Sequence, residues 1–567
     1  MPTPNLIIDH ASTAFPPIGL VTRRALSAGE RVFLCTASFR LFYQAELVSL
    51  KCLSPNGTEA SGVTFLKLED DKPARDVMKR SLGEVTLLQD LPAGTSIRVQ
   101  LRPREDMIGT AGDIEWDLRL AVIDEEEFQA NVCRFPFHDV VEPFIIRLTA
   151  SPATQVQAVR RFTGELIARL CDDQGITSPT PDVQATVRVV DESCALEFGE
   201  NGVARIGLDH AIKDRVLIET SEGFQTFANP LPRLDDNTNV FFGDIHWHSA
   251  YSTDGQRDLD RAMATCRDEL GLDFAGPSDH ILHEGDYGRS TMQDQAAVCR
   301  PFDEPGRFAV IPGFELSRRY GHCNVYTESW EQLFRIGEQF DQVFKQTLKS
   351  SKDRFFVEEL MELFESETTL VIPHHSNTSN EGPGVGPDGR SIWTAFRWPQ
   401  QLNPHHLRLI EMNQQRGCFE SETPDPLWQP PCLENPFKGG LGDSAHQALA
   451  QGHRIGFIGG TDNHNGWPTL STGRQQICGI AGVLSHELSA PSIHAALHAR
   501  RCYATTGARI VARATLNDEL IGSELSLEPD TERRFSISIH GTAPIERVEI
   551  ISFNSVIHAF PVEADAC

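Results

Sequence analysis

Hydrophobic and polar residues alternate with period two through much of the segment from residue 1 to residue 235. β-Branched residues are frequent in these stretches, and the combination is typical of strands with one solvated face. The strands that the pattern predicts most clearly run through residues 95–103, 117–123 and 186–190. Residues 160–170 carry a helical pattern instead. We therefore expect a β-rich N-terminal region of one or two sandwich-like domains, interrupted by one helix.

The pattern changes after residues 229–239, where Pro, Asn and Asp follow one another without apolar periodicity. Between residues 240 and 505, short apolar runs alternate with segments of helical periodicity, clearest at 258–270 and 353–367. The seven runs are 240–242, 272–275, 308–311, 323–326, 370–372, 407–410 and 455–458. Alternating strands and helices predict a parallel sheet of an α/β fold, and seven units favour a closed barrel.

Strand-like alternation returns after residue 505, at residues 509–516 and 535–539. This alternation predicts a small C-terminal β-region over residues 506–567. The chain is thus expected to contain a β-rich part (1–235), a barrel (240–505) and a terminal β-region (506–567).

Composition narrows the classes of partner. The chain has 567 residues, and 51 Lys and Arg against 79 Asp and Glu give a formal net charge of -28. This charge argues against a nucleic-acid partner, because such proteins need a basic surface to neutralise phosphates. The sequence shows neither a signal-peptide pattern nor a long apolar run, so we expect a cytoplasmic protein with no membrane partner. An oligomer is compatible with these features.

Histidines gather in the expected barrel. Twelve of the 20 histidines lie between residues 246 and 464, and most of the motif histidines are close to an apolar run. In a β/α barrel the residues that follow the strands converge on one face, so distant motifs meet in space. His246 and His248 lie two residues apart and would point to the same side of an extended segment, as one ion requires. Because such a polar cluster is costly to bury without cations, the pattern predicts a multinuclear metal site.

The ordered motifs resemble those of the PHP (polymerase and histidinol phosphatase) superfamily. The motifs are H-x-H at 246–248, Asp254, S-D-H ending at His280, P-G-F-E ending at Glu315 with His322 seven residues on, P-H-H at 373–375, and T-D-N-H at 461–464. Further strings at 410–420, 455–468 and 503–510 resemble a branch of PHP-like proteins of largely unassigned function with β-rich flanks. The resemblance covers about residues 240–520 and implies a distorted (β/α)7 barrel with a trinuclear metal centre.

The resemblance also implies a set of metal ligands. A first ion would take His246, His248, Glu315 and Asp462; a second would share Glu315 and take His322 and His374; a third would take Asp254, His280 and His464. Asp254 stands where some relatives have His, so the number of ions is left at two to three. Ligands of this kind, without thiolates, suit Zn, Mn or Fe. His375 would face the substrate or support the ligands, with His374 as the ligand of that pair.

Several neighbouring residues have more than one interpretation. Asp244 and Asp279 either accept a hydrogen bond from a ligand imidazole or cap a strand-to-loop turn. Glu411 is either a supporting base or an ion-pair partner of Arg416. His494 and His498 stand four residues apart on an expected helix, where a solvated face is favoured over a metal site.

The function that these residues predict is hydrolysis of a small-molecule phosphate ester, with Asp462, His375 and Arg416 in catalytic roles. Divalent ions can activate water and neutralise phosphoryl oxygens, and Arg416, Arg318 or Arg319 could clamp those oxygens. Two alternatives stay open. One is hydrolysis of an amide, lactone or sulfate ester, and the other is a catalytically silent metal-binding scaffold.

Overall fold

A computed structural model provides the structure of the chain. It describes residues 5–9, 17–35, 45–53, 59–60, 63–66, 81–103, 115–123, 137–141, 144–149, 152–172, 175–178, 180, 182–190, 192–208, 215–232, 238–249, 251–252, 255, 257–281, 289–318, 321–347, 361–362, 364, 366–376, 398, 403–415, 417–421, 444–464, 466–468 and 479–561. The described part is rich in β-strands and has few helices. None of its helices combines the length and apolar character needed to cross a membrane.

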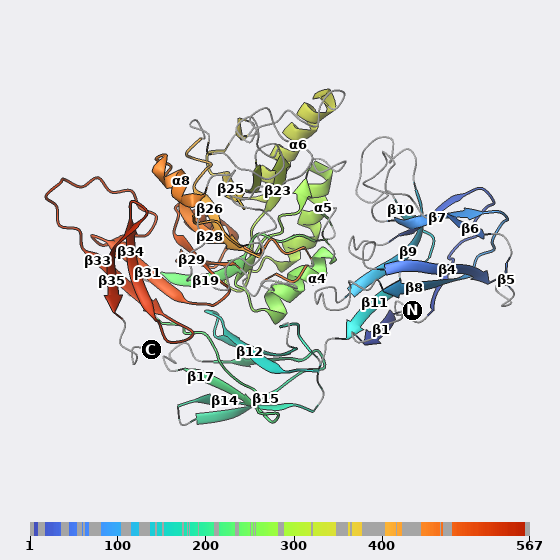
Figure 1. Cartoon of the computed structure of the whole chain (residues 1–567), viewed down its shortest axis with the longest axis horizontal. Helices are drawn as coiled ribbons and strands as arrows, with labels where there is room; N and C mark the ends of the chain where they lie inside the picture. The colour runs from blue at the N-terminus through green and yellow to red at the C-terminus, as the bar shows by residue number, and fades with distance from the viewer. Residues whose placement is uncertain are drawn as a thin grey trace.

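The first eleven strands lie together at one end of the molecule (Figure 1). They are β1 (Asn5–Asp9), β2 (Ile18–Val21), β3 (Arg31–Cys35), β4 (Ala45–Leu53), β5 (Glu59–Ala60), β6 (Val63–Leu66), β7 (Ser81–Leu87), β8 (Ser96–Pro103), β9 (Glu115–Ile123), β10 (Phe137–Asp139) and β11 (Phe144–Thr149). One sheet has the order β1-β11-β9-β3-β7-β6 with β10 beside β9, and the other has the order β2-β8-β4-β5. The strands predicted at 95–103 and 117–123 are confirmed as β8 and β9.

Two further sheets follow and share one apolar core. They contain β12 (Gln155–Arg160), β13 (Glu165–Cys171), β14 (Gln184–Val189), β15 (Glu192–Glu197), β16 (Val203–Gly207), β17 (Val216–Thr220) and β18 (Gln225–Phe227). The orders are β12-β13-β16 and β15-β14-β17-β18. Leu166 and Leu170 from the first sheet and Val187 and Ile218 from the second are buried in the same cluster, so the two sheets stabilise each other by apolar burial.

The helix predicted at residues 160–170 is wrong. This segment is an antiparallel hairpin in which β12 pairs with β13, and Gly164 at φ +82° lies in the turn between them. All residues of β13 after Glu165 are buried. A strand that is buried on both faces has no period-two alternation, so its apolar run cannot be distinguished from a helical one by pattern alone.

The central part of the chain contains three sheets and most of the helices (Figure 1). The strands are β19 (Asn239–Asp244), β20 (Phe274–Ala275), β21 (His280–Ile281), β22 (Ala309–Val310), β23 (Gly313–Arg318), β24 (Gly321–Tyr326), β25 (Leu370–His374), β26 (Leu409–Gln414), β27 (Gly417–Cys418), β28 (Gly456–Gly459), β29 (Ile480–Ser485) and β30 (Cys502–Thr505). The sheet orders are β22-β20-β19-β29-β30, β21-β23-β24-β25 and β27-β26-β28. Every one of the seven predicted apolar runs overlaps a strand.

The closed, parallel (β/α)7 barrel is not confirmed in the described residues. β19 pairs in parallel with β20, and β26 with β28, as a β/α unit requires. However, β23, β24 and β25 pair antiparallel, and so do β19, β29 and β30. Antiparallel neighbours need no helical crossover, which explains why the described residues of this part form more strands and fewer helices than the alternation predicts.

The helices cover these sheets with apolar stripes. They are α4 (Leu259–Ala264), which continues as a π-helix (Thr265–Glu269), α5 (Arg289–Cys299), which continues as a 3₁₀-helix (Arg300–Phe302), α6 (Trp330–Thr347), α8 (Ala445–Ala450) and α9 (Ala490–His498). Leu259, Ala262 and Met263 are buried on α4 as predicted. The helix predicted at 353–367 lies mostly outside the described residues.

Two buried arginines hold the loop before β20, one from the β12–β13 hairpin and one from the segment before β31. Arg161, in the turn of that hairpin, places its Nε 3.4 Å from the Oδ1 atom of Asp273 and donates to the carbonyl of Arg307. Arg509 donates to the carbonyls of Gly271 and Leu270 at 2.9 and 2.8 Å. These contacts hold the loop that leads into β20 and thereby position one end of the central sheet.

The C-terminal part consists of β31 (Val511–Leu516), β32 (Glu519–Leu520), β33 (Phe535–His540), β34 (Arg547–Ser552) and β35 (Ser555–Pro561). The strands predicted at 509–516 and 535–539 are therefore confirmed. β31 pairs with β32 and β33, and β34 and β35 form a separate hairpin.

His494 is buried on α9, with 2% of its surface exposed, so the solvated face expected for it is wrong. Burial lowers its pKa from 6.5 to about 4. Between these pH values the unfolded chain binds a proton that the folded protein excludes, so falling pH destabilises the fold by about 3 kcal/mol through this group. We expect the His494→Gln variant to lose this part of the pH dependence in urea unfolding at pH 7 and pH 4.5. The exposed His558 of β35 provides the control, His558→Gln, and an unchanged pH dependence in His494→Gln would contradict the assignment.

Candidate metal centre

The predicted ligands stand at or just beyond the ends of central strands. His246 and His248 follow β19, Asp462 and His464 follow β28, and Glu315 lies within β23. Backbone hydrogen bonds hold the first two segments together, because Asp462 N donates to His246 O at 2.7 Å and His248 N donates to the carbonyl of Asn463, also at 2.7 Å. Residues more than 200 positions apart are therefore fixed side by side.

Strand register brings the remaining ligands to the same place. His280 is paired with Glu315 across β21 and β23, and His322 with His374 across β24 and β25. Directly opposed residues on neighbouring strands point to the same face of a sheet. The register therefore places three imidazoles and one carboxylate on one face.

A first group of donors consists of His246, His248, Glu315 and Asp462, whose ligand atoms lie within 4.8 Å of one another. Glu315 Oε2 lies 3.1 Å from Nε2 of His248 and 3.3 Å from Nε2 of His246. Asp462 Oδ1 lies 3.4 and 3.6 Å from the same two nitrogens. These are the four residues that the resemblance assigns to the first ion.

A second group consists of His322, His374 and His375. Glu315 Oε1 lies 2.7 Å from Nδ1 of His322 and 3.2 Å from Nε2 of His374, so this carboxylate spans the first and second groups. The resemblance implies His374 as the ligand of this pair and His375 as a residue that faces the substrate or supports the ligands, whereas the structure brings both imidazoles into the group.

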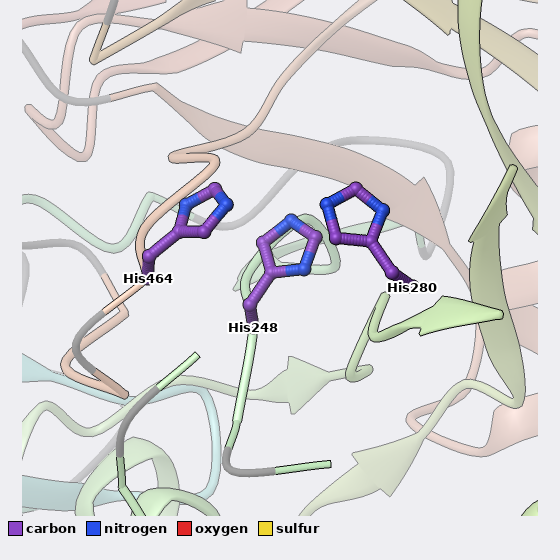
Figure 2. Close-up of side chains that lie close together, drawn as sticks. All are labelled: His248, His280 and His464. Atoms are coloured by element: carbon purple, nitrogen blue, oxygen red, sulfur yellow. The ribbon is translucent and has the colours of Figure 1, made fainter. Parts of the chain in front are cut away.

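A third group consists of His248, His280 and His464. Figure 2 shows the three rings side by side, carried by three separate segments of the chain. The ring centre of His248 lies 4.1 Å from that of His464 and 4.6 Å from that of His280. Asp254, which was expected in this group, lies outside the described residues.

The donor chemistry fits divalent ions. Nε2 of His248 and Nδ1 of His374 are buried and make no hydrogen bond of good geometry with any described residue. Burial lowers the pKa of His374 to about 4 and holds that of His248 well below its usual range. Both rings are therefore neutral at pH 7 and keep the lone pair that a metal ion needs.

Glu315 is ionised in the middle of these rings. Burial alone would raise its pKa, but the surrounding imidazoles, first those of His280 and His374 and then the close ring nitrogens of His246 and His248, together hold the pKa well below its usual range. The three donor groups together contain seven histidines and two carboxylates. Such a set has more nitrogen than oxygen, which suits Zn or Fe, and also Mn at the group that contains both carboxylates.

Glu411 supports a ligand imidazole, which agrees with the first of the two interpretations given for it above. Its Oε2 lies 2.6 Å from Nδ1 of His246, and both side chains are buried. A proton on Nδ1 directs the lone pair of Nε2 toward Glu315 and Asp462. The alternative partner, Arg416, lies outside the described residues, as does Arg319. Only the backbone of Arg318, in β23, is described.

Asp244 and Asp279 hold loop backbones. Asp244 accepts from the backbone N of His246 at 3.0 Å and from Oγ1 of Thr461 at 2.6 Å, and burial raises its pKa to about 7. Asp279 accepts from the backbone N of Ser249 at 2.6 Å. These contacts favour the capping interpretation over a partner for ligand imidazoles.

Two glutamines were missed by the sequence analysis. Gln414 Nε2 donates to Oδ2 of Asp462 at 2.7 Å, and Gln415 donates to the carbonyl of Asp462. Asp462 itself has φ +52°, a conformation that costs energy for most residues other than Gly. Both glutamines lie in the segment 410–420, which carries part of the resemblance. Glutamine is not a usual ligand of Zn, Mn or Fe, so the residue pattern gave no reason to single them out.

No family model matches the chain. Uncharacterized proteins of Chlamydia trachomatis serovar D and Chlamydia muridarum are each 26% identical to it, over 380 and 384 residues. The matches cover 64% of this chain and 54% of each relative, so the chain spans about half the length of the curated relatives it matches. A solved two-domain protein from Bacteroides vulgatus, described as containing a predicted PHP-like metal-dependent phosphoesterase, has 14% identity and a TM-score of 0.32 over 59% of this chain and 97% of its own.

Gly460 allows Glu411 to approach His246. A Cβ atom at this position would lie 2.7 Å from Cβ of His246 and would also collide with Oε2 of Glu411. We expect Gly460→Ala to lower the free energy of unfolding by about 1–3 kcal/mol and to weaken Zn²⁺ binding by about 10-fold through the displaced His246. Urea unfolding and Zn²⁺ titration measure the two effects. Gly207→Ala in β16, where a Cβ atom meets nothing within 4 Å, is the control; equal behaviour of the two variants would contradict this role.

Proposed function

We propose that this chain is a PHP-like metal-dependent hydrolase, and that its reaction is hydrolysis of a phosphate ester of a small molecule. The observation that carries the proposal is the convergence of three donor groups on Glu315 and His248, with most of their side chains buried. Such a cluster is costly to form unless cations compensate it. The ordered motifs of the PHP superfamily on the same residues add to this support.

The proposed ligands follow the donor groups. His246, His248, Glu315 and Asp462 would hold one ion, and Glu315, His322 and His374 a second. A third position would use His280 and His464, with His248 within reach and Asp254 as a further candidate. Divalent ions bound there would lower the pKa of water and offset the negative charge of a phosphoryl group.

The protein's own side chains set the geometry for this chemistry. Glu411 holds the proton of His246 on Nδ1, so that Nε2 faces the cluster. Gln414 fixes Oδ2 of Asp462, which leaves Oδ1 directed at the ligand nitrogens. Asp462 is the carboxylate that we propose takes a proton from the attacking water, because its Oδ1 faces the centre. While Oδ1 accepts this proton, His246, His248 and Glu315 would hold the first ion.

Charge supports a small substrate. With a net charge of -28 the chain would repel a nucleic-acid backbone at long range. A small phosphate ester has a single phosphoryl group, whose negative charge bound divalent ions could neutralise locally. Arg416 remains the side chain that we propose for the non-bridging oxygens. The same donors could polarise a carbonyl or a sulfate ester, so amide, lactone and sulfate substrates form the second candidate class.

His464 provides a test of the reaction. We expect His464→Ala to lower turnover of a chromogenic phosphate monoester or diester at least about 100-fold, in protein reconstituted with Mn²⁺ or Zn²⁺. The His558→Ala variant, which changes an exposed histidine of β35, should keep wild-type turnover. Addition of a chelator should stop the wild-type reaction, and the metal should restore it.

The ratio of monoester to diester turnover would then assign the substrate class. Absence of turnover with either metal and either ester would reject the phosphoesterase assignment and favour the second candidate class. Turnover that survives in His464→Ala would show that this histidine is not part of the centre.

A further inference from the structure

We infer that His375 is an additional ligand of the second ion, so that His322, His374, His375 and Glu315 together hold it. This inference rests on the proposed function, because it requires the centre to bind metal. The starting observation is that one ring nitrogen of each of the three histidines lies within 4.8 Å of those of the other two. The ring centre of His375 is 4.6 Å from that of His322 and 4.5 Å from that of His374.

The backbone at His375 is arranged to produce this contact. β25 ends at His374, and successive side chains along an extended strand point to opposite faces. His375 would therefore point away from the cluster if the strand simply continued. Its φ of +32° breaks the alternation, and its imidazole returns to the side on which His374 lies.

The backbone at His375 adopts an uncommon conformation. A positive φ at a residue other than Gly costs about 1–3 kcal/mol and persists at sites where the local geometry serves a function. His375 is only 4% exposed, so its imidazole also loses its contacts with water. A coordinate bond from the ring nitrogen to an ion would contribute to offsetting both costs.

With His375 as a ligand, the two ion positions would differ in their share of nitrogen and oxygen donors. The first group has two histidines and two carboxylates, whereas the second would have three histidines and one carboxylate. Four protein donors can fill the tetrahedral shell of Zn²⁺, and the higher share of nitrogen favours Zn or Fe over Mn. The second position would then bind its ion more tightly and more selectively than the first.

The test compares Zn²⁺ binding by the metal-free wild-type protein and by the His375→Asn variant. Asn tolerates a positive φ but removes the imidazole. We expect one Zn²⁺ ion to bind about 100-fold more weakly in the variant, measured by competition with a chromophoric chelator and by metal content after dialysis. The remaining ions should bind with unchanged affinity.

Two further variants separate coordination from folding. His375→Gly, which accommodates the positive φ without strain, should show the same loss of one ion while its metal-free form unfolds at a urea concentration no lower than that of His375→Asn. His494→Asn removes a buried histidine outside the cluster and should leave Zn²⁺ binding unchanged. The intensity of the visible absorption of bound Co²⁺ should change in the two His375 variants alone.

The possible results are distinct. Equal Zn²⁺ stoichiometry and affinity in wild type and His375→Asn would overturn the inference; if turnover fell at the same time, His375 would be assigned to the substrate. Absence of Zn²⁺ binding by the wild type would overturn both the inference and the proposed function. Loss of one ion in the His375 variants, together with no phosphoester turnover by the wild type, would support the inference and reject the phosphoesterase assignment.

Discussion

The central constraint in this structure is the burial of one negatively charged carboxylate, that of Glu315. With 1% of its surface exposed, it has lost its hydration, and such a loss is tolerated only when polar partners replace the water. Each oxygen has imidazole nitrogens within 3.3 Å. These rings belong to β24, β25 and the segment after β19. Because all of them surround Glu315, these three segments must converge on β23, the strand that carries it.

Much of this convergence could be predicted from the sequence. The apolar runs that precede the motifs overlap strands, and His246, His248 and Asp462 meet Glu315 as the ordered motifs imply. The convergence of these residues can be predicted because short apolar runs and side chains able to bind metal are both recognisable in a single sequence. The number of ions, their identity and the substrate are not encoded in residue types in this way and stay proposals.

Other features depend on contacts that no local pattern contains. The hairpin of β12 and β13 has the apolar composition of a helix because β13 is covered on both faces, and coverage is a property of the tertiary structure. The pairing of Glu411 with His246 depends on Gly460, where the missing side chain leaves space. The antiparallel pairing of β23 with β24 was likewise outside the pattern, which predicted an apolar run at 323–326 and none over residues 313–318.

The contact between Arg161 and Asp273 bears on how this protein could have been assembled from parts. Asp273 is buried in the central part and also accepts a hydrogen bond from the backbone of Phe242, while its cationic partner belongs to the hairpin of β12 and β13. A copy of residues 240–505 transferred alone to another gene would therefore lose both the guanidinium that pairs with Asp273 and the hairpin that covers its loop. The smallest heritable unit that keeps this charge paired begins before the metal-binding segment, at the β12–β13 hairpin.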